Sequence, residues 1–145
     1  MTLGKLSGMQ THHVALRVPD AEASKAWFLE KLDFRVEGEF EINGMDFVWI
    51  CPRGQSAPMI ELIGGGTLHS RAPQENLSEI LAQPGFHHVC LQVDDINLVV
   101  NELRRREVKI LIDVMDAAPG SGAEKVAFIT DPWDNILEFV QLIRK

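Results

Sequence analysis

A short segment near the N-terminus recurs in the second half of the chain, and this repeat limits the possible folds more than any other feature. Residues 12–18 read His-His-Val-Ala-Leu-Arg-Val, and residues 87–93 read His-His-Val-Cys-Leu-Gln-Val. The copies lie about half of the 145-residue chain apart, which is typical of one structural unit used twice. The chain is therefore predicted to contain two similar modules.

The hydrophobic pattern predicts the same order of elements in both modules: a strand, a helix and three further strands. Asp20 is expected to cap the first helix, and Asn43-Gly44 favours a tight hairpin turn. In the first half, the predicted strands are 11–18, 34–42, 45–51 and 58–63, and the predicted helix is 21–32. In the second half, the predicted strands are 86–93, 108–112, 125–130 and 135–142, and the predicted helix is 95–107.

These elements predict a first module at 11–64, a linker with a short helix at 65–85 and a second module at 86–142. Neither half is long enough to bury a comfortable core alone, so one compact domain overall is expected. Residues 113–123 are rich in Ala, Gly, Ser and Pro and are expected to form a loose segment.

Composition and charge limit the classes of molecule that this protein is expected to bind. The net charge is -7 and no basic stripe is present, which argues against a nucleic acid or an anionic membrane. No apolar run spans a membrane and no signal peptide is recognisable, so a cytoplasmic protein with a small-molecule substrate is expected. Cys51 and Cys90 lie in apolar runs without metal-type spacing and are predicted to be buried free thiols.

Each half carries a histidine near the start of its first strand and a glutamate within its last strand. The pairs are His13 with Glu61 and His88 with Glu138. Both glutamates are flanked by apolar residues, where a carboxylate is costly unless it is paired or binds a metal. Two imidazoles and two carboxylates suit one divalent transition ion such as Ni, Co, Mn, Fe or Zn. The alternative is a metal-free fold in which these polar groups satisfy one another.

These runs resemble the vicinal oxygen chelate superfamily, which includes glyoxalase I, methylmalonyl-CoA epimerase, extradiol dioxygenases and bleomycin-resistance proteins. The resemblance extends over about 11–142 and includes the runs 27–34 and 126–138. It implies an α+β fold of two tandem β-α-β-β-β modules that form a cup-shaped mixed β-sheet with helices outside, in a homodimer. The family's ligand position matches His13 and His88, whereas His12 and His87 are expected to face away.

The order His, Glu, His, Glu is most similar to that of glyoxalase I. This resemblance implies a metal-dependent lyase or isomerase that moves a proton next to a carbonyl of a small oxygenated substrate. Glu138 would act as the base and Glu61 as its counterpart. Arg17 matches an arginine that contacts a substrate carboxylate in glyoxalase I. Further candidates for substrate binding or the apolar pocket wall are Gln92, Trp49, Met59, Ile136 and Val140.

Two alternatives stay open. An extradiol-type ring-cleaving dioxygenase needs only the two histidines and the last glutamate, although the absence of tyrosine from the chain counts against it. A small-molecule binding protein of the bleomycin-resistance type would sequester an antibiotic without chemistry. Metal content and oxygen uptake with catechols would separate these classes.

Overall fold

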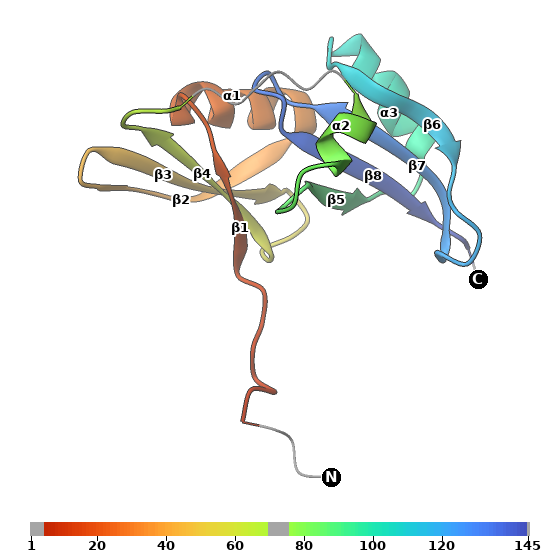
Figure 1. The fold of residues 1–145 in the computed structure, drawn as a ribbon, viewed down its shortest axis with the longest axis horizontal. Coiled ribbons are helices and arrows are strands. Elements are labelled where there is room, and N and C mark those ends of the chain that lie inside the picture. Colours follow the sequence, from red (N-terminus) through yellow and green to blue (C-terminus); the bar gives the residue numbers. More distant parts are fainter. Residues whose placement is uncertain (1–4, 70–75, 145) are drawn as a thin grey trace. The chain divides into compact units, whose positions relative to one another are not determined.

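The computed structural model describes residues 5–69 and 76–144 and divides into two compact units, Met1–Thr67 and Leu68–Lys145 (Figure 1). Each unit holds one four-stranded mixed sheet and follows the order β-α-β-β-β, with one extra short helix at the start of the second unit. The predicted α+β fold of two modules is therefore confirmed. The predicted linker falls partly on residues 70–75, which lie outside the described residues. Within the described ranges, no helix is long and apolar enough to cross a membrane.

The first unit pairs its strands in the order β1-β4-β3-β2, with β1 parallel to β4 and the other pairs antiparallel. The Asp20 side chain accepts a hydrogen bond from the Ala23 backbone at 3.0 Å and so caps the helix as expected. Asn43 and Gly44 both have positive φ, 51° and 77°, as a tight hairpin requires. The elements are β1 (His13–Arg17), α1 (Ala21–Leu32), β2 (Phe34–Ile42), β3 (Met45–Pro52) and β4 (Met59–Gly65).

The core of the first unit lies between α1 and one face of its sheet. Phe28 of α1 is fully buried, and the strands contribute Ile50 and Leu62, which are also fully buried. Because side chains alternate along a strand, the residues next to Ile50 and Leu62, such as Trp49 and Glu61, lie on the other face of the sheet. That second face carries the candidate site residues of β1, β3 and β4.

The second unit repeats this arrangement with the strand order β5-β8-β7-β6, and β5 is parallel to β8. Its helix α3 buries Ile96, Val100 and Leu103 and is capped by Asp95, whose side chain accepts from the Leu98 backbone at 3.0 Å. The elements are α2 (Leu77–Leu81), β5 (His88–Gln92), α3 (Ile96–Arg105), β6 (Ile110–Asp116), β7 (Ala123–Thr130) and β8 (Ile136–Leu142).

The prediction of a loose segment at 113–123 was partly wrong. Strand β6 continues to Asp116, where Met115 pairs with Val126 and Asp116 pairs with Lys125. The pairing is irregular between Ile112 and Met115, so the alternation of apolar and polar residues is interrupted there. The sequence pattern therefore predicts a strand that ends too early. The connection between β6 and β7 is therefore only 117–122.

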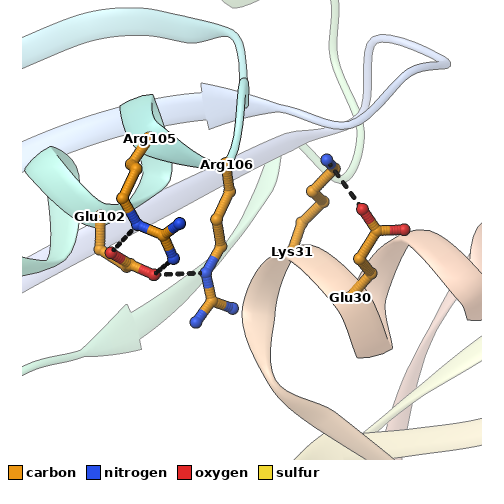
Figure 2. A network of polar contacts seen from close by, with 5 residues as sticks. All are labelled: Glu30, Lys31, Glu102, Arg105 and Arg106. Atoms are coloured by element: carbon orange, nitrogen blue, oxygen red, sulfur yellow. Dashed lines mark hydrogen bonds and ion pairs between the residues drawn. The ribbon is translucent and has the colours of Figure 1, made fainter.

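At the end of α3 lie three consecutive arginines, Arg104 to Arg106; Arg104 pairs with Asp113, and the other two pair with Glu102. Glu102 accepts from Nε of Arg105 at 2.8 Å and from Nε of Arg106 at 2.8 Å (Figure 2). These hydrogen bonds lower the pKa of Glu102 to about 2. Figure 2 also shows the ion pair of Lys31 with Glu30 on α1, at 3.0 Å. The arginine run thus forms a helix end stabilised by local ion pairs.

Candidate metal centre

The parallel pairing of β1 with β4 brings the first predicted pair together. Ala15 lies directly opposite Glu61, and His13 is two residues before Ala15 on the same face. Nε2 of His13 is 3.5 Å from Oε1 of Glu61. The pair therefore follows from strand register, because strand partners in register project to the same side of a sheet.

The second unit builds its pair in the same way. Cys90 lies directly opposite Glu138 on the parallel strands β5 and β8, and His88 is two residues before Cys90. Nε2 of His88 lies 2.7 Å from Oε2 of Glu138. Each unit thus places an imidazole nitrogen beside a carboxylate oxygen at the equivalent position of its sheet.

The two glutamates have different surroundings. Glu61 is buried, with 8% of its surface exposed, and its Oε2 accepts a hydrogen bond of 2.7 Å from Nε1 of Trp49. Trp49 is the strand partner of Glu61 on β3. Glu138 is half-buried, and its partner on β7 is Phe128, a side chain without a hydrogen-bond donor. The carboxylates therefore occupy matching places but differ in how they are held.

The doubled histidines contact each other in both units. Nδ1 of His12 is 2.8 Å from Nδ1 of His13, and Nδ1 of His87 is 2.7 Å from Nδ1 of His88. His12 was expected to face away, but its ring lies against that of Trp49 with centroids 5.1 Å apart; the matching expectation for His87 stays a prediction. Burial, followed by the nearby His88, lowers the pKa of His87.

The donor atoms of each pair fit a divalent transition ion. Bonds of about 2.1 Å to nitrogen and oxygen place two neighbouring ligand atoms about 3.0–3.4 Å apart for right-angled to tetrahedral geometry. The nitrogen-to-oxygen distance of 3.5 Å in the first pair lies just above this range, whereas the 2.7 Å of the second pair is that of a direct hydrogen bond and must lengthen to admit an ion. In the described part of the chain, no three His, Cys, Asp or Glu side chains gather as one potential metal site. Each unit therefore supplies one His–Glu pair.

Arg17 lies on the same face of β1 as His13 but is engaged by the backbone. Its Nη1 donates to the carbonyl oxygens of Val18 at 2.9 Å and Ile63 at 2.8 Å, and its Nη2 donates to that of Gly65. The guanidinium thus ties the end of β1 to the end of β4. Among the residues that the structure describes, its Nε and one Nη2 hydrogen take no part in these bonds.

The other candidates for substrate binding lie beside the two pairs. Met59 is buried and is the strand partner of His13, and Ile136 is buried and is the partner of His88. Gln92 is exposed on the same face of β5 as His88. Val140, the partner of Gln92, is half-buried. Met59 and Ile136 thus adjoin the histidines, whereas Gln92 and Val140 lie one strand pair beyond Cys90 and Glu138 on the same face.

One cysteine differs from its prediction. Cys51 is buried as expected, whereas Cys90 is exposed. Cys90 alternates with Val89 and Leu91 and so lies on the face of β5 that carries His88, away from the side covered by α3. Partial burial and the carboxylate of Glu138 raise the pKa of the Cys90 thiol to about 11.

Two β-α-β-β-β modules that carry equivalent His–Glu pairs define a class of repeat proteins with candidate metal sites. The family model of the Glyoxalase/Bleomycin resistance protein/Dioxygenase superfamily matches residues 10–139. The chain belongs to this superfamily, which confirms the resemblance inferred from its sequence.

Curated relatives include two enzymes. The chain is 27% identical over 129 residues to the mitochondrial methylmalonyl-CoA epimerase of Bos taurus, with 88% of this chain and 67% of that protein covered. It is 26% identical over 144 residues to the lactoylglutathione lyase of Schizosaccharomyces pombe, with 92% of this chain and 46% of that protein covered. The chain thus spans two thirds or less of the length of these relatives.

Solved structures of the same fold include an enzyme and a binding protein. The trypanothione-dependent glyoxalase I of Leishmania major aligns with a TM-score of 0.64 at 20% identity, with 92% of this chain and 87% of that chain covered. An antibiotic-binding protein from Streptomyces sp. CB03234 aligns with a TM-score of 0.62 at 17% identity, with 93% and 97% covered. At these identities the likeness supports the fold alone.

Proposed function

We propose that this protein is a metal-dependent, glyoxalase I-like lyase or isomerase that transfers a proton next to a carbonyl of a small oxygenated substrate. The observation that carries the proposal is the repeated His–Glu pair, at 3.5 Å in the first unit and 2.7 Å in the second. One such pair could be a structural ion pair. Its repetition at the same strand positions favours a shared role.

The proposed ligands of one divalent transition ion (Ni, Co, Mn, Fe or Zn) are His13, Glu61, His88 and Glu138. A bound ion of this kind supplies positive charge that stabilises a negative oxygen developing beside the reacting carbon. The homodimer implied by the resemblance and a cytoplasmic location belong to the same proposal. Size-exclusion chromatography with light scattering tests the dimer.

Glu138 is the proposed base. Its carboxylate takes the proton from the carbon next to the carbonyl, and the electron pair of that C–H bond moves toward the carbonyl oxygen. As a carboxylic acid, Glu138 then returns the proton to the former carbonyl carbon, while the hydroxyl proton of the first carbon passes to the new oxyanion, so that an α-hydroxy carbonyl substrate is isomerised without loss of atoms. Glu61 is the counterpart at the same position of the first unit.

The remaining candidates would bind and orient the substrate. Met59 offers apolar contact beside His13, Gln92 offers an amide on the face of His88, and the free donors of Arg17 suit a substrate carboxylate. Trp49 was a further candidate from the sequence, and its ring lies beside that of His13 with centroids 6.1 Å apart. The relatives support this general chemistry, since their names describe an epimerase and a lyase.

The first test is metal content by elemental analysis of protein purified without an affinity tag and then reconstituted. We expect about one transition ion per four-ligand site in the wild type, and its loss in His88→Ala and Glu138→Ala. His69→Ala is the matched control, because His69 is an exposed histidine outside both pairs. A wild type that binds no metal after reconstitution would contradict the proposal and favour a binding protein.

The second test is proton exchange in D₂O followed by NMR. The first substrates to try are thiol hemithioacetals of methylglyoxal and acyl-CoA thioesters. Deuterium should enter the carbon next to the carbonyl only with metal-loaded wild type and not with Glu138→Ala. Oxygen uptake with catechols would instead support the dioxygenase alternative.

A further inference from the structure

We infer that Trp49 is a positioning residue that fixes the carboxylate of Glu61 as a metal ligand, a restraint that the proposed base Glu138 lacks. This inference rests on the proposed function and extends it to the unequal roles of the two glutamates. Trp49 entered the sequence analysis as a substrate-binding candidate. Its contacts assign it a different role.

The contact that carries the inference joins the indole N–H to the buried carboxylate. Nε1 of Trp49 donates to Oε2 of Glu61 at 2.7 Å, and Oε1 of the same carboxylate faces Nε2 of His13 at 3.5 Å. One oxygen is therefore held by the indole, and the other is directed toward the imidazole. A hydrogen bond from a neutral donor to a carboxylate is stronger than one between neutral groups, especially where water is largely excluded.

The rings around Trp49 hold the indole itself in place. Its ring is T-shaped against those of His12 and Phe40, with centroids 5.1 Å and 5.2 Å apart, and is nearly parallel to that of His13. An indole packed on three sides has little freedom to rotate, so its N–H points at a fixed place. Outer groups held in this way orient metal ligands and tune their affinity.

The second unit lacks the same device at the equivalent position. Phe128 occupies the place of Trp49 as the strand partner of Glu138, and its ring contacts that of His88 at 5.7 Å. Each unit places an aromatic ring beside its histidine, stacked at 29° in the first and edge-to-face at 85° in the second, but only the first of these rings has an N–H for its glutamate. Glu138 instead contacts Nε2 of His88 at 2.7 Å and the thiol of Cys90, so the two carboxylates are held by different groups.

The experiment begins with the indole N–H signals of the metal-free protein in ¹H–¹⁵N NMR spectra. The chain has three tryptophans, and Trp49→Phe assigns the signal of Trp49 by its loss. We expect that signal to shift and to exchange faster with solvent in Glu61→Ala, and to stay unchanged in Glu138→Ala. If the chemical shift and exchange rate of the Trp49 signal are the same in wild type and Glu61→Ala, the inference is overturned.

Metal titration then tests the positioning role. Trp49→Phe keeps a smaller aromatic ring beside His13 and removes the donor, so we expect metal affinity to fall about 10–100-fold and the visible spectrum of the Co²⁺-loaded protein to change. Trp27→Phe, the same substitution on α1, is the control and should change neither. Circular dichroism verifies that both variants fold.

The outcomes separate the inference from the proposed function. Equal Co²⁺ affinity and an equal spectrum in wild type and Trp49→Phe would overturn the inference and leave the proposed function standing. A wild type that binds no metal would overturn both. Weaker binding and an altered spectrum in Trp49→Phe, with Trp27→Phe unchanged, would support the inference.

Discussion

Cys90 and Glu138 are direct partners across the parallel strands β5 and β8, so a thiol lies beside the carboxylate that we propose as the base. The pKa of this thiol is raised to about 11, first by partial burial and then by the charge and hydrogen bond of Glu138. Because the thiolate is the nucleophile, an accessible cysteine with such a pKa reacts slowly near neutral pH. Cys90 is therefore exposed but reacts slowly, and its reaction rate should depend on the charge of Glu138.

The first prediction is that Glu138→Gln speeds the alkylation of Cys90. In metal-free protein at pH 8, removal of the negative charge should lower the thiol pKa and raise the rate with iodoacetamide by at least about threefold. Mass spectrometry of tryptic peptides measures the rate at each cysteine. Cys51 is buried and should react in neither protein until denaturant is added. An unchanged rate at Cys90 would mean that the thiol does not sense Glu138.

The second prediction concerns the histidine that precedes each proposed ligand. When His88 binds an ion through Nε2, its proton lies on Nδ1 and can be donated to Nδ1 of His87, which is 2.7 Å away. Partners of this kind orient the ring of a metal ligand, so His87→Ala should weaken metal binding by about 10–100-fold. Isothermal titration with Zn²⁺ measures the change. Equal losses in His87→Ala and the control His69→Ala would argue against a specific role.

Much of this molecule could be predicted from its sequence because the decisive signals are local or repeated. The half-length repeat predicted the two modules, Asn43-Gly44 predicted the hairpin, and Asp20 predicted the start of α1. The pairing of His13 with Glu61 was also accessible, because the resemblance places both on the strands of one module. Such features depend on a few neighbouring residues or on a comparison of the two halves.

The parts that escaped prediction depend on contacts between strands. The bond from Trp49 to Glu61 requires the register of β3 on β4, which the pattern of either strand alone does not specify. The alternation of Phe47, Trp49 and Cys51 was a usable signal, since it indicates that Trp49 shares a face with its neighbours two residues away. The exposure of Cys90 was also not predicted, because a run of apolar residues does not indicate which of them face the helix.

The third prediction is a pH-dependent effect of Asp131, in the turn before β8. This buried carboxylate accepts from the backbones of Trp133 and Asn135 at 2.9 Å and 2.8 Å and from the Asn135 side chain at 2.7 Å. Burial nevertheless raises its pKa above the ordinary value. A raised pKa in the folded state means that stability is greatest below the unfolded pKa and is lost as pH rises through the folded pKa.

Asp131→Asn removes this titration and keeps an acceptor for the two backbone donors. The free energy of unfolding of the wild type, relative to that of the variant, should therefore fall as pH rises from about 3.5, near the ordinary pKa of aspartate, to neutrality. Urea unfolding of both proteins at several pH values measures the difference. A difference that grows with pH would show that the three hydrogen bonds to the charged carboxylate outweigh its burial.

The fourth prediction tests the packing of α1 on its sheet. Gly64 of β4 lies under the first residue of the helix, and a Cβ at this position would be 2.5 Å from the backbone nitrogen of Ala21 and 2.7 Å from its Cβ. Neither atom can rotate away, so Gly64→Ala must displace the helix and should cost about 1–3 kcal/mol. Gly54→Ala is the matched control, because nothing lies within 4 Å of its added Cβ. Urea unfolding midpoints measure both changes. If Gly64→Ala costs no more than Gly54→Ala, which lies in the turn after β3, the close approach of α1 to β4 is not a constraint on the fold.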